Sequence, residues 1–202
     1  MKKESNVYPV IFMTVVTAIT VLILAFVNQS TMATRIDNKN LEERRKILYV
    51  FDKYDENQTS DEEVNQIFEN EVKTQTDSKG REIYILEENG EAKAYAIPFD
   101  GPGLWGEIIG YIGLNSDLEH ITGVEFFKQS ETPGLGGRIS EAPYKEQYRG
   151  VEILKDNSPY IINKPAPGGN IDAIAGATQT STFVQNMINE GIDFFLQEGG
   201  AK

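Results

Sequence analysis

The strongest constraint in this sequence of 202 residues is a long interval without charge close to the N-terminus. No Asp, Glu, Lys or Arg occurs between Glu4 and Arg35, and the segment from Tyr8 to Val27 is almost wholly apolar. As a helix, such a segment rises about 30 Å, which matches the hydrocarbon core of a bilayer. We therefore expect a transmembrane helix at residues 8–27.

A cleaved signal peptide is the alternative, with Lys2 and Lys3 as its positive N-terminal region. However, the apolar stretch is longer than that of a typical signal peptide, and no small-x-small cleavage site follows it. We favour an uncleaved anchor with a short cytoplasmic N-terminus at residues 1–7. Because a domain of this size can cross a membrane regardless of its charge, we expect the remainder of the chain to lie outside the cytoplasm.

Charge and composition exclude several classes of function. The chain has 31 acidic residues against 19 Lys and Arg, a formal charge of −12, so it lacks the electrostatic attraction that binds nucleic acids. It has no cysteine, and His120 is its single histidine. Disulfides, thiolate zinc sites, cysteine-ligated iron–sulfur clusters and bis-histidine haem are thereby excluded, and we predict no metal site. Redox chemistry in this chain would need an organic cofactor.

Residues 28–75 form a predicted connecting segment of helices. Apolar residues recur at helical spacing from Leu41 to Phe51, with charged residues between them. Ser60 and Glu63 have the spacing of a capping box, ahead of apolar residues that continue at helical spacing from Val64 to Val72. We expect both helices to serve in packing.

Residues 76–202 are predicted to form one α+β domain with a mainly antiparallel sheet and flanking helices. Apolar and polar residues alternate at 82–88 and 92–99, and Asn89-Gly90 between them indicates a hairpin. Two more strands are expected at 107–114 and 120–127, joined by a turn, and a further one near Tyr160. Helical spacing resumes at Thr182, and the final helix is expected to stop at Gly199-Gly200.

Three glycine-rich segments interrupt this pattern. The first glycine loop (residues 101–106) reads GPGLWG and holds the single tryptophan, Trp105; the second (131–137) reads ETPGLGG; the third (168–178) ends in DAIAGAT. Small residues in the third loop allow another molecule to approach its backbone, and Thr178 is expected about one turn before the final helix. The free N–H groups and the dipole at the start of that helix would favour a phosphate near the hydroxyl, although a simple capping role is the common alternative.

Together, the N-terminal span, the ERRK segment and the three loops resemble one family over nearly the whole chain. The sequence is similar to the membrane-anchored FMN-binding subunits of ion-translocating electron-transport complexes. These are the G subunit of Rnf-type complexes and the C subunit of sodium-pumping NADH:quinone reductases. The combination of the three motifs in this order carries the resemblance, since each motif alone is weaker.

The resemblance implies the site residues. In this family, FMN is joined through its phosphate to the last threonine of the third motif, which corresponds to Thr178 here, and a separate flavin transferase makes the bond. Ala175 stands where the motif usually has Ser or Thr. The resemblance further implies that the transferase recognises Asp172, Gly176 and Ala177, and that flavin contacts come from Gly176, Ala177, Thr132, Leu135 and Trp105.

The predicted function is therefore electron transfer by covalently bound FMN, as one subunit of an ion-translocating oxidoreductase in the cell membrane. Its partners would be other membrane subunits and the flavin transferase. No side chain is predicted to act as a catalytic acid, base or nucleophile. Two alternatives stay open: a stand-alone flavoprotein anchored outside the cell, and a non-enzymatic anchored binding or scaffold module.

Overall fold

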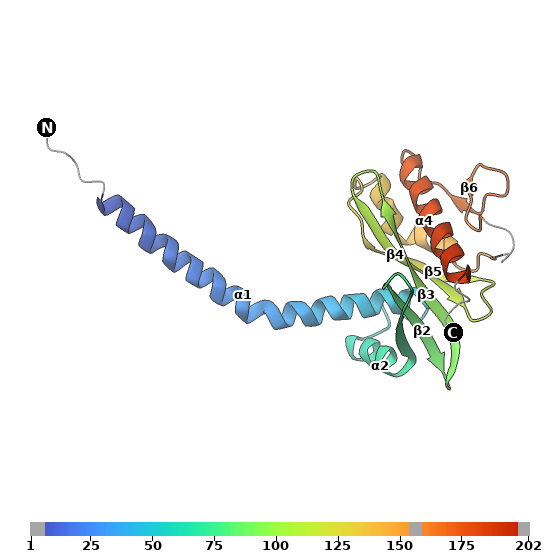
Figure 1. Ribbon diagram of the computed structural model, residues 1–202, viewed down its shortest axis with the longest axis horizontal. Coiled ribbons are helices and arrows are strands. Elements are labelled where there is room, and N and C mark those ends of the chain that lie inside the picture. Colours follow the sequence, from blue (N-terminus) through green and yellow to red (C-terminus); the bar gives the residue numbers. More distant parts are fainter. Residues whose placement is uncertain (1–6, 154–158, 198–202) are drawn as a thin grey trace. The chain divides into compact units, whose positions relative to one another are not determined.

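The computed structural model describes residues 7–153 and 159–197 (Figure 1). The chain divides into two compact units, Met1–Glu42 and Glu43–Lys202. One long helix, α1 (Val7–Val50), contributes residues to both units. The helix predicted at 41–51 is therefore the C-terminal part of α1 and not a separate element, because no helix-breaking residue separates it from the apolar segment.

The first unit contains the apolar part of α1. Val7–Met32 is long and apolar enough to cross a membrane, which supports membrane association. The hydroxyls of Thr14 and Thr20 donate to carbonyls four residues earlier, at 2.8 and 2.9 Å, so these polar groups are satisfied within the helix. The predicted flanking charges Lys2 and Lys3 lie outside the described residues.

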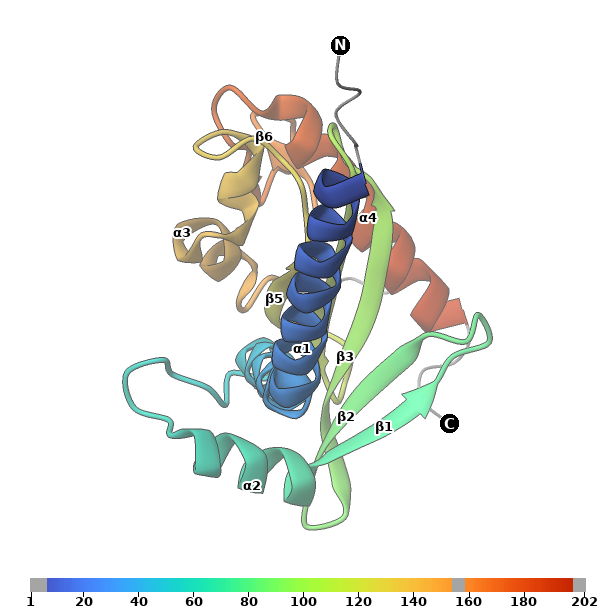
Figure 2. The same cartoon turned by 90° about the vertical axis from the view of Figure 1, so that its left-hand side faces the viewer.

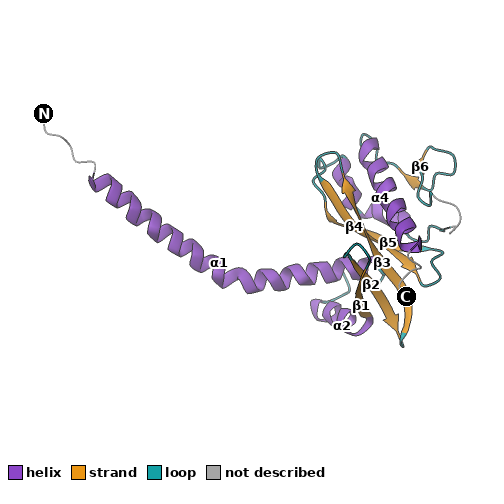
Figure 3. Ribbon diagram, viewed as in Figure 1, coloured by secondary structure: helices purple, strands orange, loops and turns teal. Residues whose placement is uncertain are grey.

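The second unit is built on an antiparallel sheet whose five strands follow one another in space in chain order (Figure 3). The hairpin turn has the positive φ angles of a two-residue turn, 55° at Asn89 and 80° at Gly90. The predicted α+β class is confirmed, and so are the four strands predicted between residues 82 and 127. The strands are β1 (Val72–Thr76), β2 (Glu82–Glu88), β3 (Glu91–Pro102), β4 (Glu107–Asn115) and β5 (Ile121–Lys128).

The final helix, α4 (Thr178–Gln197), packs along β3 and covers one face of the sheet (Figure 2). Its apolar side meets the inward-facing residues of the strands and forms the main core. Buried members of this core include Ile97, Ile112, Leu114, Val184 and Ile188. The helix thus fixes one wall of the domain, with its N-terminus at the end of the third glycine loop.

The end of α1 is fastened to the same domain. Its last buried residue, Val50, lies against Gly113 and Gly123, where an added Cβ would come within 2.8 and 2.9 Å of Val50 atoms. The Val50 carbonyl accepts the Thr122 hydroxyl at 2.8 Å, and the carbonyl before it accepts Arg149 Nη2 at 2.9 Å. Two C-terminal carbonyls of α1 are therefore satisfied by side chains from far along the sequence.

A second helix, α2 (Asp61–Glu71), follows α1. The Ser60 side chain accepts the N–H of Glu63 at 3.3 Å, as the predicted capping pattern requires. The helix ends earlier than expected, because Val72 already begins β1. Short elements complete the unit: η1 (Gly136–Ser140), α3 (Ala142–Lys145), η2 (Glu146–Tyr148) and a two-stranded parallel pair, β6 (Asn163–Lys164) and β7 (Ile171–Asp172).

The strand predicted near Tyr160 is largely wrong. Its backbone N–H groups bond to side-chain amides and not to a neighbouring strand: Tyr160 and Ile161 donate to Asn189 Oδ1 at 2.8 and 2.9 Å. Asn170 Oδ1 accepts the N–H of residue 162 at 2.9 Å. With these donors satisfied, only the first residue of β6 continues the predicted strand. The predicted stop at Gly199-Gly200 lies outside the described residues.

Candidate functional site

The three glycine loops meet around one cavity of about 450 Å³. The first loop supplies Leu104 and Trp105 from the turn between β3 and β4, and the second supplies four residues from the segment after β5. The third loop and the first turn of α4 complete the wall. Six residues predicted from the sequence line this cavity together: Trp105, Thr132, Leu135, Gly176, Ala177 and Thr178.

Asp172 is the predicted site residue that does not line the cavity. It is exposed in β7 and forms an ion pair with Lys164 at 3.0 Å. Its own N–H donates to Gln147 Oε1 at 2.7 Å. Its predicted role, recognition by a flavin transferase, stays a prediction.

Thr178 is the first residue of α4, so the expectation that it lies one turn before the helix is wrong by about four residues. The helix starts early because the Ala177 carbonyl already accepts the N–H of Ser181 at 3.1 Å. Thr178 is exposed, and its hydroxyl forms no hydrogen bond with any described residue. The first turn, all of it described, contains no acidic side chain to compete for the unpaired N–H groups there.

Two positions explain how the loops approach so closely. Gly176 has a φ of 80°, a conformation that costs a side-chain-bearing residue energy, and a Cβ there would come 3.1 Å from Leu135 Cδ2. Leu135 of the second loop therefore sits directly against the third loop. Their contact places an aliphatic side chain beside the start of α4.

The mouth of the cavity is apolar and exposed. Trp105 is 68% exposed, Leu104 48% and Leu135 44%. Large exposed apolar side chains that surround a cavity are typical of a ligand-binding site. An aromatic and two aliphatic side chains could cover the faces of a flat ring system, with Thr132 available to its polar edge.

Glu131 is the residue of this site that the sequence reasoning missed. It is only 5% exposed, and one of its carboxylate oxygens, Oε1, accepts the N–H groups of Leu104 and Trp105 at 2.8 and 3.1 Å. Its other oxygen, Oε2, accepts the Thr180 hydroxyl at 2.6 Å. Glu131 thus bonds to both the first glycine loop and the first turn of α4.

A match with a known family coincides with this cavity: residues 103–193 match the FMN-binding domain. The matched segment includes all three walls of the cavity, from Gly103 through the second loop to Thr178. The resemblance inferred from the sequence motifs is therefore confirmed.

Curated proteins similar to the chain include NqrC proteins, the C subunits of Na⁺-translocating NADH-quinone reductases. The chain is 31% identical to the NqrC protein of Yersinia pestis over 126 residues, which is 59% of this chain and 46% of the relative. It is 31% identical to that of Pseudomonas aeruginosa over 130 residues, covering 56% and 49%. The chain thus spans about half the length of these relatives, which are subunits of an oxidoreductase complex.

Two solved structures share the fold. NqrC of Shewanella oneidensis superposes with a TM-score of 0.66 at 20% identity, covering 79% of this chain and 97% of that one. The corresponding NqrC protein of Parabacteroides distasonis gives a TM-score of 0.69 at 22% identity, covering 85% and 98%. The fold of this domain is therefore one already seen in crystal structures.

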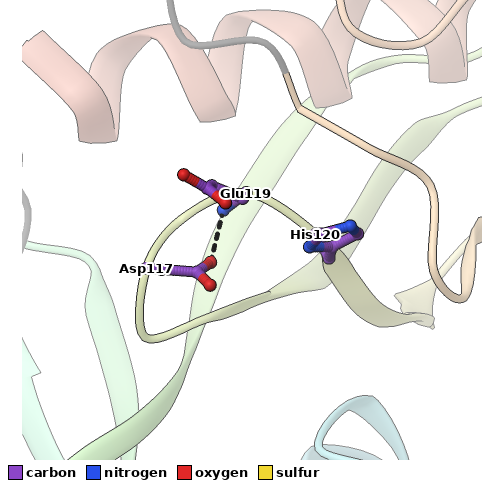
Figure 4. Close-up of side chains that lie close together, drawn as sticks. All are labelled: Asp117, Glu119 and His120. Atoms are coloured by element: carbon purple, nitrogen blue, oxygen red, sulfur yellow. Dashed lines mark hydrogen bonds between the residues drawn. The ribbon is translucent and has the colours of Figure 1, made fainter.

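A second cluster of polar side chains lies away from the cavity, in the turn between β4 and β5. Ligand atoms of Asp117, Glu119 and His120 lie within 4.8 Å of one another, and all three residues are exposed (Figure 4). The Asp117 carboxylate accepts the N–H of Glu119 at 2.8 Å, and Asn115 Oδ1 accepts that of His120 at 2.9 Å. These bonds close a tight turn and fix the backbone of Glu119 and His120.

Proposed function

We propose that this chain is an electron-transfer subunit that carries FMN covalently bound to Thr178 in a membrane ion-translocating oxidoreductase complex. The observation that carries the proposal is the convergence of three separate sequence motifs on one cavity inside a segment of the FMN-binding family. The cavity volume of about 450 Å³ suits a ligand of flavin size.

The residues around the cavity fit the two chemical parts of FMN. The apolar side chains at its mouth suit the ring, and Thr132 suits a polar edge. The phosphate suits the start of α4, where backbone N–H groups and the helix dipole stabilise negative charge. Thr178 holds its hydroxyl at this position, so attachment and charge stabilisation coincide at one residue.

Attachment would be a phosphoester bond. The Thr178 oxygen would bond to the phosphorus of the FMN half of a flavin dinucleotide, the phosphoanhydride bond would break, and the other half would leave as a nucleoside monophosphate together with the hydroxyl proton. A separate flavin transferase would catalyse this step and recognise Asp172, Gly176 and Ala177, of which the last two also border the cavity. The net gain is one FMN less one water.

When bound, FMN would supply reversible one-electron redox chemistry. The chain's own residues would hold and orient it: Thr178 fixes one end, while Trp105 and Leu135 cover the ring and exclude water from its faces. No side chain needs to transfer a proton for this role. The exposed mouth of the cavity leaves a path for electrons to neighbouring cofactors in partner subunits.

The proposal includes the type of complex and the membrane topology. The complex would be of the Rnf type or of the Na⁺-translocating NADH:quinone reductase type, and the named relatives favour the second. The apolar segment of α1 would cross the membrane once, with the N-terminus in the cytoplasm and the FMN-binding domain outside. There, covalent attachment would prevent loss of the flavin.

Intact mass spectrometry tests the proposal. The full chain is co-expressed with a flavin transferase, as wild type, Thr178→Val and Thr182→Val. Wild type and Thr182→Val should gain one FMN less one water, and Thr178→Val should gain nothing. Thr182 is a matched control, because it is an exposed threonine in the same helix that does not line the cavity. An unmodified wild type would refute covalent attachment.

A further inference from the structure

Glu131 has an environment that is unusual for a loop carboxylate. It is almost fully buried, and it alone is charged among the described residues that line the cavity. Three donors meet its two oxygens: two backbone N–H groups at Oε1 and one hydroxyl at Oε2. Donors on both oxygens match the acceptor-only pattern of an ionised carboxylate.

The backbone around Glu131 is shaped to its side chain. A Cβ at Gly103 would come 2.6 Å from Oε1, and a Cβ at Gly136 would come 2.6 Å from Oε2 and 2.7 Å from Thr180 Oγ1. Glycine at these two positions therefore allows two loops to close directly onto the carboxylate. The fit is specific to this side chain and goes beyond general packing.

The donors to Glu131 come from two other walls of the cavity. Leu104 and Trp105 lie in the first glycine loop, Glu131 begins the second, and Thr180 follows Thr178 by two residues in α4. Glu131 joins these three segments through one carboxylate. Without this carboxylate, the first glycine loop, which holds Trp105, would no longer be connected to the start of α4, which holds Thr178.

We infer that Glu131 is the positioning residue of the flavin site: its carboxylate holds Trp105 and the start of α4 in register before any flavin is attached. This inference rests on the proposed function for the identity of the ligand. The positioning role of Glu131 can be tested on the chain without flavin, so this inference and the proposed function can fail separately. Glu131 acts through its neighbours and takes no part in the bond at Thr178.

The first test needs no flavin. Amide hydrogen exchange is measured by NMR on the full-length ¹⁵N-labelled chain in detergent micelles. In Glu131→Ala, the amides of Leu104 and Trp105 should exchange about tenfold or more faster, because each loses a bond to a charged acceptor. Glu131→Gln should restore most of the protection, since its amide oxygen can still accept both N–H groups.

Glu125 provides the matched control. It is a buried glutamate, 7% exposed, whose carboxylate bonds to Lys145 and to the N–H of Phe126, and it does not line the cavity. Glu125→Ala should leave the exchange of Leu104 and Trp105 unchanged, even if it lowers the stability of the domain. Equal exchange at these two amides in wild type and Glu131→Ala would overturn the inference.

The second test measures the rate of flavin incorporation by the transferase. Glu131→Ala and Thr180→Val should each slow incorporation by about tenfold, because each removes the hydrogen bond that ties α4 to residue 131. The double variant should be no slower than Glu131→Ala alone, since both changes remove the same bond. Thr180→Val should leave the Leu104 and Trp105 amides protected, since their bonds go to the other oxygen.

The outcomes separate the two proposals. A wild type that takes no flavin refutes the proposed function, and hydrogen exchange then decides the role of Glu131 by itself. A wild type that takes flavin, together with a Glu131→Ala variant that takes it at the same rate, refutes the positioning role and leaves the proposed function intact. Additive effects in the double variant would also contradict the shared bond.

Discussion

The Thr180 hydroxyl donates a hydrogen bond of 2.6 Å to the carboxylate of Glu131, across 49 residues of sequence. Both residues are buried, at 1% and 5% exposure, so the bond lies out of water. It connects the segment after β5 to the first turn of α4. The position of Thr178 therefore depends on a contact that its own sequence neighbourhood does not reveal.

The stability of the domain should respond to this bond. Thr180→Val keeps the shape of the side chain but removes the donor, which leaves Glu131 Oε2 without its partner. We expect a loss of about 1–3 kcal/mol in the free energy of unfolding. Thr180→Ser should lose much less. Thermal unfolding in detergent measures both, and equal stability of the Val variant and wild type would contradict the prediction.

Gly136 should not tolerate a side chain. Gly136→Ala places a methyl group 2.6 Å from Glu131 Oε2, which we expect to cost about 1–3 kcal/mol of stability through overpacking. The neighbouring Gly137 is the control, because its nearest atom would be 3.2 Å away. Gly137→Ala should cost less. The melting temperatures of the two variants compare them directly.

Arg149 should be important for the attachment of α1 to the domain. Its guanidinium donates to the carbonyls of Tyr49 and Thr122 and forms an ion pair with Glu146 at 2.9 Å. Arg149→Met removes the guanidinium donor from the Thr122 carbonyl and from the Tyr49 carbonyl, although the latter keeps the N–H of Asp52 at 3.1 Å. We expect a loss of about 1–3 kcal/mol in the free energy of unfolding, measured by thermal unfolding.

Arg138 is the control for this change. It is exposed and, among the described residues, forms one ion pair, with Glu141 at 3.3 Å. Arg138→Met should change stability by about 0.5 kcal/mol or less. Similar losses in the two arginine variants would show that Arg149 contributes only as a surface charge.

Alkaline pH should unfold the domain through its buried tyrosines. Burial raises the pKa of Tyr144 to about 12. The pKa of Tyr111 also rises to about 12, first through burial and then through the negative charges of Glu82 and Glu43. A raised pKa means that the folded state favours the protonated phenol. Its stabilising contribution is complete below the ordinary value of 10.0 and falls as pH rises toward 12.

The measurement is the melting temperature as a function of pH for wild type and Tyr144→Phe. Wild type should lose stability between pH 10 and 12, and the Phe variant should lose less over the same interval. A Phe variant whose melting temperature falls as steeply as that of wild type would contradict the assignment to Tyr144.

Alternating and helical periodicity predicted most of the architecture, because these elements bury one regular face. The strands from 82 to 127 and the helix ending the chain follow this rule. β1 (Val72–Thr76) escaped prediction because it has one buried residue followed by four exposed ones. The segment from Tyr160 was mistaken for a strand because side-chain amides, whose positions depend on tertiary structure, satisfy its backbone.

In the candidate site too, some residues were predictable from the sequence and others only from the tertiary structure. The glycine motifs identified the cavity-lining residues Trp105, Leu135 and Thr178, which the fold then brought together. Glu131 was missed, because a glutamate in a loop is usually exposed and only the three-dimensional arrangement reveals its three donors. The glycines at 103 and 136 were a signal for close backbone approach, although the sequence could not indicate what approached them.

The central claim is the attachment of FMN to Thr178, and fragmentation of the modified peptide tests it most directly. One stretch of α4 presents four hydroxyl-bearing residues, Thr178, Thr180, Ser181 and Thr182, so intact mass alone does not identify the site. Tandem mass spectrometry of the chain co-expressed with a flavin transferase should place the added phosphoflavin on Thr178. Phosphoflavin on another of these residues, or an unmodified peptide, would contradict the account.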